Sequence, residues 1–152
     1  MNLQKIARRT IAAGIVAATA AVGFAGSAQA VSLAGCTATP FAPVFSHINA
    51  AGNKVLRYRV VIVCAGNRTI TAQQQRKEQD GFLNPDDLVG TAVFSRAFPV
   101  AGVQTVNILA TLPNTELGNE ELYQRIRIRV ASGGVVSAWS AWDSSGVRSF
   151  SN

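Results

Sequence analysis

The chain has 152 residues and a formal net charge of +6, yet only 14% of its residues are charged. This length is typical of one domain, and the low charged content is unlike a polycationic nucleic-acid binder. The single histidine, His47, and two cysteines exclude a histidine-rich or cysteine-rich metal centre, so we expect no metal and no cofactor. Because of the low charged content, we also expect no nucleic acid as partner.

A secretory signal peptide is predicted over residues 1–30. Basic residues at positions 5, 8 and 9 precede an apolar run over 10–24, and Ala28-Gln29-Ala30 supplies a small-residue cleavage site. The apolar run is shorter than the roughly 20 residues that span a bilayer. We therefore expect cleavage after Ala30, by the general secretory or the twin-arginine route. The product, residues 31–152, would be one secreted or cell-envelope domain with no membrane span.

Residues 31–152 carry a net charge of 11 − 8 = +3, which also argues against nucleic acid. They contain both cysteines of the chain, and an even number of cysteines in an exported protein favours a disulfide. The only intramolecular pairing joins Cys36 to Cys64. Closing this loop stabilises a folded chain by roughly 3 to 4 kcal/mol in the chain-entropy model.

Short segments of alternating apolar and polar residues, bounded by Gly, Pro and Asn, predict strands throughout residues 31–152. The expected strands cover 37–46, 56–64, 68–79, 91–98, 103–112, 122–130 and 135–142, with a short extended piece at 147–150. Seven strands and almost no helix signal predict an all-β, antiparallel β-sandwich.

The segment 73–79 is the most polar run of the chain, with three consecutive glutamines followed by Arg76, Lys77 and Glu78. Polar and charged side chains on an edge strand discourage edge-to-edge pairing. We expect this segment to lie at the edge of a sheet, with an exposed binding strand as the alternative.

The segment 122–131, the turn 132–134 and the following Ser137-Ala138-Trp139-Ser140 resemble the last two strands of a fibronectin type III or related immunoglobulin-like domain. Trp139-Ser140-Ala141-Trp142 is also similar to the Trp-Ser-x-Trp-Ser box of cytokine receptors, although Asp143 stands in place of the second serine. In that box, arginines of the neighbouring strand stack between the tryptophans. The resemblance implies a seven-strand immunoglobulin-like β-sandwich.

A row of arginines is the candidate ligand-binding feature. Arg125, Arg127 and Arg129 should project from one face at intervals of about 6.8 Å, and guanidinium groups bind carboxylates, phosphates and sulfates. Alternatively, the arginines stack on Trp139 or Trp142 and pair with Glu or Gln of a neighbouring strand. A ligand site at these five residues requires arginines without intramolecular partners.

No catalytic residues are predicted. His47 has no motif nearby that supplies a nucleophile, and the acidic residues of the longest loop, Asp80, Asp86 and Asp87, match no calcium-loop spacing.

The leading hypothesis is therefore a secreted, non-enzymatic β-sandwich module that binds a protein or an acidic surface polymer through its arginine-bearing face. A structural or envelope-associated protein without a ligand site is one alternative. A small secreted enzyme or enzyme inhibitor that uses the loop over residues 81–90 is the other.

Overall fold

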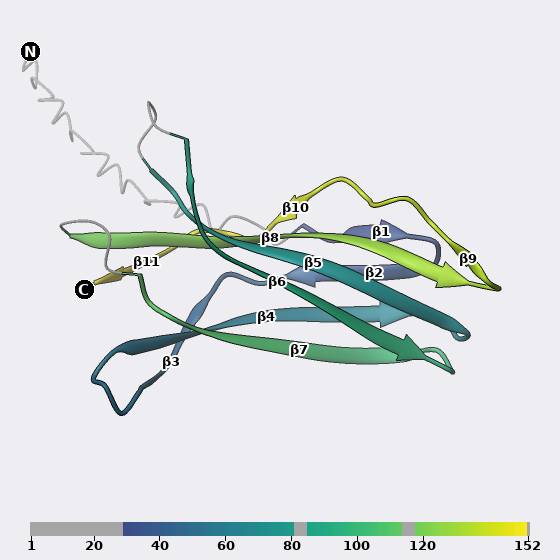
Figure 1. The fold of residues 1–152 in the computed structure, drawn as a ribbon, viewed down its shortest axis with the longest axis horizontal. Coiled ribbons are helices and arrows are strands. Elements are labelled where there is room, and N and C mark those ends of the chain that lie inside the picture. The colour runs from purple at the N-terminus through teal and green to yellow at the C-terminus, as the bar shows by residue number, and fades with distance from the viewer. Residues whose placement is uncertain (1–28, 81–84, 114–117, 152) are drawn as a thin grey trace, which may run out of the picture.

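The computed structural model describes residues 29–80, 85–113 and 118–151 (Figure 1). Apart from its last two residues, the predicted signal peptide lies outside this part of the chain. The described residues contain strands and no helix, and every strand pair is antiparallel. The predicted all-β class is confirmed.

The strands form two sheets. The bounds are β1 (Val31–Leu33), β2 (Cys36–Pro40), β3 (Val44–Ile48), β4 (Lys54–Cys64), β5 (Arg68–Glu78), β6 (Asp87–Phe98), β7 (Gly102–Thr111), β8 (Asn119–Ser132), β9 (Val135–Val136), β10 (Asp143–Ser144) and β11 (Arg148–Ser151).

In the first sheet, β4 lies at the centre, with β7 along one edge and β2 and β3 along successive parts of the other; β1 pairs with β2. In the second sheet, β5 and β8 are central. Strand β6 borders β5, and β9, β10 and β11 follow one another along the free edge of β8. Figure 1 shows β4 and β7 in one layer and β5, β6 and β8 in the other.

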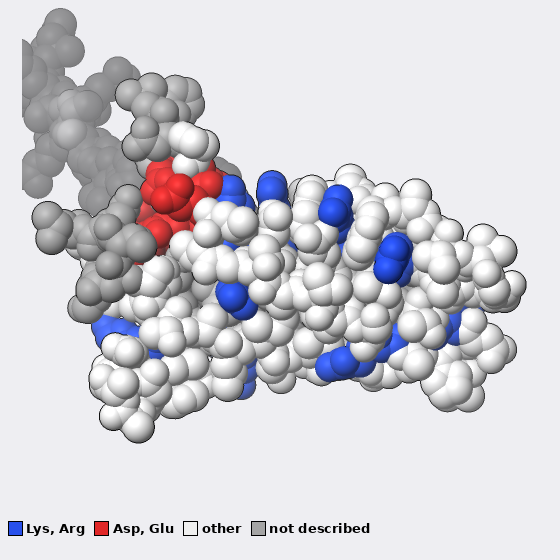
Figure 2. All heavy atoms as spheres, in the orientation of Figure 1, with Lys and Arg blue, Asp and Glu red and all other residues white. Residues whose placement is uncertain are grey.

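Charge is segregated along the molecule. Figure 2 shows the acidic side chains gathered at one end, whereas the basic ones are spread along its length. The acidic residues flank the segments that join β5 to β6 and β7 to β8; in the described part of the chain Asp143, on β10, is the exception. A field of this kind attracts anions to the basic surface.

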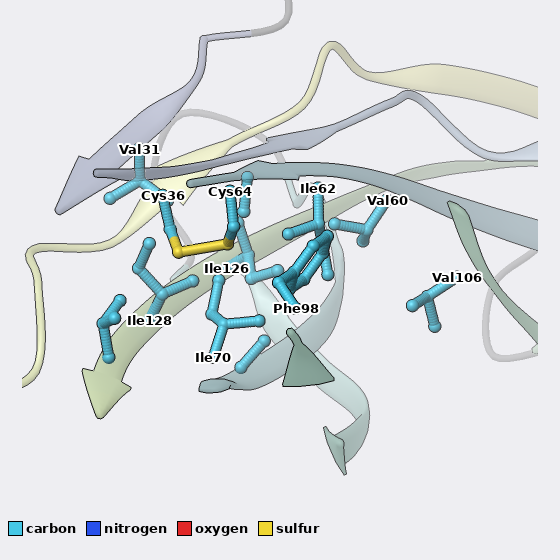
Figure 3. Close-up of a cluster of buried hydrophobic side chains, with 13 residues drawn as sticks. Val31, Cys36, Val60, Ile62, Cys64, Ile70, Phe98, Val106, Ile126 and Ile128 are labelled. Atoms are coloured by element: carbon cyan, nitrogen blue, oxygen red, sulfur yellow. A yellow bond between two sulfur atoms is a disulfide. The ribbon is translucent and has the colours of Figure 1, made fainter. Parts of the chain in front are cut away.

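The core lies between the two sheets, where side chains of alternate residues meet (Figure 3). Ile62 on β4 and Ile126 and Ile128 on β8 are fully buried. The remaining members of the main cluster are Val31, Cys36, Ala38, Val60, Cys64, Ile70, Ala72, Phe98, Val106 and Val130. The period-2 pattern therefore predicts correctly which face of β4 and of β8 is buried.

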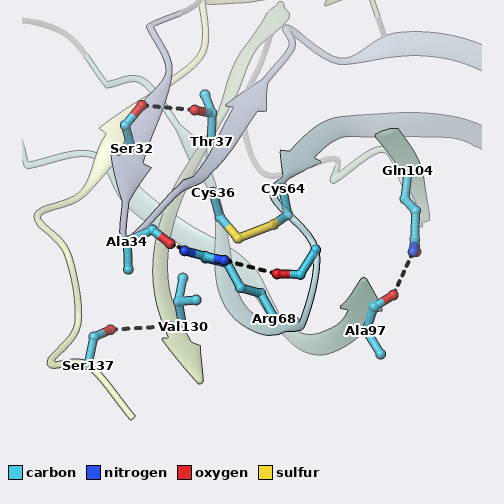
Figure 4. The surroundings of a disulfide bond; sticks show 11 residues. Ser32, Ala34, Cys36, Thr37, Cys64, Arg68, Ala97, Gln104, Val130 and Ser137 are labelled. Carbon is cyan, nitrogen blue, oxygen red and sulfur yellow. Dashed lines mark hydrogen bonds between the residues drawn. A yellow bond between two sulfur atoms is a disulfide. The ribbon is translucent and has the colours of Figure 1, made fainter. Parts of the chain in front are cut away.

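The disulfide between Cys36 and Cys64 is confirmed. The two residues stand opposite each other in the ladder between β2 and β4, with 4.1 Å between their Cα atoms. Beside it, Arg68 donates hydrogen bonds from Nε to the Ala34 carbonyl (2.6 Å) and from Nη1 to the Gly66 carbonyl (2.9 Å) (Figure 4). One side chain thus joins the turn before β2 to the turn after β4.

The predicted strand over 37–46 is in fact two strands. Pro40 ends β2 and Pro43 precedes β3, and proline cannot donate to a β-ladder. The intervening Phe41 still donates its N–H to the Arg59 carbonyl (3.0 Å). The chain therefore bends at this point while it stays bound to β4.

The predicted strand over 135–142 is also wrong beyond Val136. Instead, two serines bind β8 with both their backbone and their side chain. Ser137 donates its N–H to the Val130 carbonyl, and its Oγ accepts the Val130 N–H. Ser140 is bound to Ile128 in the same way. Hydroxyl groups thus replace the carbonyls that a regular strand would offer.

The segment 73–79 is not at an edge, because β5 pairs with β6 on one side and with β8 on the other. Strand β6 is an edge strand of the second sheet, and β7 is an edge strand of the first. The glutamines are accommodated in a central strand because each face of β5 offers them polar partners: Gln73 and Gln75 bind arginines of β8, and Gln74 binds Gln124.

Gln124 joins the two sheets through the core. Its side chain is fully buried, and Nε2 donates to the carbonyls of Phe41 (2.6 Å) and Arg59 (2.9 Å) in the opposite sheet. Its Oε1 accepts a hydrogen bond from Gln74. All hydrogen-bonding positions of this amide nitrogen are used, which is the condition under which a buried polar side chain is tolerated.

Removing the disulfide should lower the free energy of unfolding by about 3 to 4 kcal/mol, because the loop of 28 residues is no longer constrained in the unfolded chain. Urea denaturation of a Cys36→Ala/Cys64→Ala variant, compared with the oxidised protein, measures this. A loss below about 1 kcal/mol contradicts the assignment of a stabilising role.

Replacing the buried glutamine, Gln124→Leu, should cost about 2 to 3 kcal/mol, since the Phe41 carbonyl and the Gln74 amide lose their partner. The matched control is Gln104→Leu, whose side chain binds the Ala97 carbonyl (2.9 Å) at the surface. We expect this control to change stability by no more than about 0.5 kcal/mol in the same denaturation experiment. Equal losses in the two variants would show that Gln124 has no special role.

Candidate functional site

The predicted site residues lie together on the outer face of the second sheet. Arg125, Arg127 and Arg129 project outward because their neighbours on β8, such as Ile126 and Ile128, face the core. The turn at Gly133 and Gly134, both with positive φ (58° and 80°), returns the chain alongside β8. The serine hydrogen bonds described above then hold the segment that carries Trp139 and Trp142.

The arginines and tryptophans alternate in a stack, which we call the arginine ladder (Arg125, Arg127, Arg129, Trp139 and Trp142). The Trp142 ring centre lies 4.8 Å from the Cζ atoms of both Arg125 and Arg127, and the Trp139 ring centre lies 5.0 Å from those of Arg127 and Arg129. Contacts of this kind contribute about 0.5 to 1 kcal/mol each at exposed sites.

Two arginines of the ladder are also held from the neighbouring strand. Nε of Arg125 donates to Oε1 of Gln75 (2.7 Å), and Nε of Arg127 donates to Oε1 of Gln73 (2.8 Å). The residue of β5 opposite Arg129 is Thr71. Stacking on tryptophan is therefore confirmed for all three arginines, and pairing with glutamine is confirmed for Arg125 and Arg127. These two arginines do not meet the requirement for side chains without intramolecular partners.

The outer edges of the guanidinium groups are nevertheless unoccupied. Within residues 29–80, 85–113 and 118–151, the Nη nitrogens of Arg125, Arg127 and Arg129 donate no hydrogen bond, and no carboxylate forms an ion pair with them. The ladder thus holds three positive charges in fixed positions without neutralising them.

A tyrosine hydrogen bond joins β8 to the segment before β6. The hydroxyl of Tyr123 donates to Oδ2 of Asp86 (2.5 Å), and Lys77 donates to the carbonyl of the same residue. Burial, together with this hydrogen bond and the charge of Asp86, raises the pKa of Tyr123 to about 12. The acceptor therefore holds the phenol in its neutral form.

Tyr58, the second tyrosine of the chain, is buried between the sheets. Burial raises its pKa to about 12, and the nearby Glu78 adds to this rise while Arg76 opposes it. The guanidinium of Arg76 lies 5.7 Å from the Tyr58 ring centre. Arg76 also passes over Gly90, so a larger residue at that position would displace its guanidinium group.

The other residues considered from the sequence form no site. His47 is exposed, and its Nδ1 lies 3.1 Å from Oγ of the adjacent Ser46. The described residues contain no group of three metal-ligating side chains. Nor does a helix long and apolar enough to cross a membrane occur among them.

Comparisons of the chain with family models, with curated proteins and with solved structures found no match. The resemblance to fibronectin type III and immunoglobulin-like domains is therefore untested by these comparisons and stays a prediction. The disulfide is consistent with an extracellular location.

Sequence reasoning predicted Glu or Gln partners on a neighbouring strand but did not identify them as Gln73 and Gln75. Gln73 and Gln75 stand at alternate positions of β5, as Arg125 and Arg127 do on β8. The equal spacing of the two patterns is a usable signal only once the two strands are known to be neighbours.

Both tyrosines should stay protonated in the folded protein up to about pH 12. A raised pKa in the folded state means that this contribution to stability is complete below pH 10, the pKa in the unfolded chain, and is lost as the pH rises from 10 through 12. Ultraviolet titration of phenolate absorbance measures this. In an Asp86→Asn variant, Tyr123 should ionise closer to pH 10 while Tyr58 is unchanged. Ionisation of both tyrosines near pH 10 in the unaltered protein would contradict the described environments.

Proposed function

We propose that the protein is an exported, non-enzymatic, immunoglobulin-like β-sandwich module that binds an anionic partner, an acidic surface polymer or an acidic protein, at the arginine ladder. The observation that carries the proposal is the row of guanidinium edges that have no partner among residues 29–80, 85–113 and 118–151. Their flat faces are covered by tryptophan and two of their Nε groups by glutamine, so the side chains are already ordered before a ligand arrives.

Ordering of this kind favours binding, because a long side chain that is immobile in the free protein loses little entropy in the complex. An exposed guanidinium edge offers two parallel N–H groups, which match a carboxylate, sulfate or phosphate. A linear polyanion can meet several such edges at once, since the arginines follow one strand.

The order of the strands supports the immunoglobulin-like assignment. Strands β4 and β7 lie in one sheet and β5 and β8 in the other. When β1, β2 and β3 are counted together as the first strand, β4 and β7 are the second and fifth strands, and β5 and β8 are the third and sixth. Immunoglobulin-like domains also place their second and fifth strands in one sheet and their third and sixth strands in the other. Export is supported by the signal-like sequence of residues 1–30 and by the disulfide.

A purely structural role of the ladder is the second candidate function. It is favoured by the hydrogen bonds to Gln73 and Gln75, which join β5 to β8 on the outer face of the sheet. In this role the ladder fixes the segment over residues 137–142 against β8, and the arginines serve as spacers between the tryptophans. The two candidates make opposite predictions for the retention of Arg129→Gln on a polyanion, and a second variant measures the structural contribution of the glutamines.

Arg129→Gln removes one charge of the ladder and leaves both hydrogen bonds between arginine and glutamine in place. If the ladder binds anions, this variant should elute from a dextran sulfate column at lower salt than the unaltered protein, with stability lowered by no more than about 1 kcal/mol. Arg96→Gln, on β6, has the same change of charge and should shift elution less.

Gln73→Ala/Gln75→Ala keeps all charges and removes the two hydrogen bonds. We expect a loss of about 1 to 3 kcal/mol in urea denaturation, with retention on dextran sulfate preserved. Unchanged retention of Arg129→Gln would refute the binding proposal. Together with a loss of stability in the glutamine variant, it would leave the structural role.

A further inference from the structure

A second basic feature lies at the seam between the two sheets, where the chain bends between β2 and β3. A cavity of about 280 Å³ opens there. Its lining consists of Phe41, Ala42, Val44, Arg57, Arg59 and Arg148. Three of these six residues are arginines and none is acidic.

The arginines reach the cavity from both sheets. Arg57 and Arg59 are alternate residues of β4 and project from its outer face, whereas Arg148 belongs to β11, at the edge of the second sheet. Residues two apart in a strand are about 6.8 Å apart along it, so the first two guanidiniums can reach one small ligand together.

The positive charge of the cavity is not neutralised by the described residues. Arg57 and Arg148 are exposed and make no hydrogen bond or ion pair within the described part of the chain. The guanidinium of Arg59 lies 4.1 Å from the ring centre of Phe41, which restricts its position and leaves its charge available.

The backbone of the cavity is held from inside the core. The carbonyls of Phe41 and Arg59 are the two acceptors of the buried Gln124 amide, and Phe41 is also hydrogen bonded to Arg59 through the backbone. Two lining residues are therefore fixed by a side chain that is fully buried. A binding residue supported in this way keeps its position when the ligand is absent.

We infer that this cavity binds the phosphate group of a phosphate monoester whose carrier is about the size of one sugar. A carboxylate is saturated by one forked guanidinium, whereas a phosphate monoester offers three terminal oxygens and a charge of about −1.5 to −2. Three arginines in the lining of one cavity match the phosphate monoester better than the carboxylate.

The remaining lining, Phe41, Ala42 and Val44, is apolar and gives the carbon skeleton of the carrier a surface to contact. The volume is close to the lower limit of roughly 300 Å³ for small-molecule sites. A volume of this size matches a phosphorylated sugar. This inference does not depend on the arginine ladder, with which the cavity shares no residue.

Isothermal titration calorimetry of the exported protein with glucose 6-phosphate, inorganic phosphate and gluconate tests the inference at constant ionic strength. Glucose 6-phosphate should bind most tightly, and gluconate, a carboxylate, at least about tenfold more weakly. In Arg57→Gln/Arg148→Gln the affinity for glucose 6-phosphate should fall at least about tenfold. Arg96→Gln, which removes one charge from β6, outside both the cavity and the ladder, should bind it as the unaltered protein does.

Three results would overturn the inference: no binding of either phosphate, unchanged affinity in Arg57→Gln/Arg148→Gln, or an equal loss in Arg96→Gln, which would indicate attraction by net charge alone. Equal affinity for inorganic phosphate and glucose 6-phosphate would overturn the sugar-sized carrier. If Arg57→Gln/Arg148→Gln does not fold, Arg57→Lys/Arg148→Lys takes its place, because it retains the charge and removes the forked donors. It should bind glucose 6-phosphate about three- to tenfold more weakly, and unchanged affinity in it overturns the match to three guanidiniums.

Discussion

Strand β8 has to satisfy two opposite environments with one alternating sequence. Its inward residues, among them Leu122, Ile126 and Ile128, complete the core, while the residues between them present arginines to the outside. A shift of one residue in the pairing with β5 would place guanidiniums in the core and isoleucines in solvent. The register of β8 therefore fixes the core and the arginine ladder together.

The sequence alone predicted whatever follows from residue alternation and from simple counting. Alternation identified the buried faces of β4 and β8, and two cysteines allowed one pairing, which the structure has. The resemblance to the Trp-Ser-x-Trp-Ser box predicted the stacking of arginines on tryptophans as one of two alternatives. Each of these predictions needs only local information or a single choice.

The remaining features depend on which strands are neighbours, which alternation does not contain. The glutamines of β5 suggested an exposed edge, yet their partners are side chains of β8 and of the core. The basic cavity was not predicted, because Arg148 is far from Arg57 and Arg59 in sequence and belongs to the other sheet. The hydroxyl groups of Ser137 and Ser140 take the place of a regular ladder along β8, and residue alternation does not predict such contacts.

The position of the disulfide within one sheet has a consequence for the order of events during maturation. Cys36 and Cys64 face each other because β2 pairs with β4, so strand pairing itself brings the two thiols together. The sequence holds no third cysteine, so no other intramolecular pairing competes with this one. Oxidation then locks a register that the backbone has already chosen, and the cohesion between the sheets is left to the core and to Gln124.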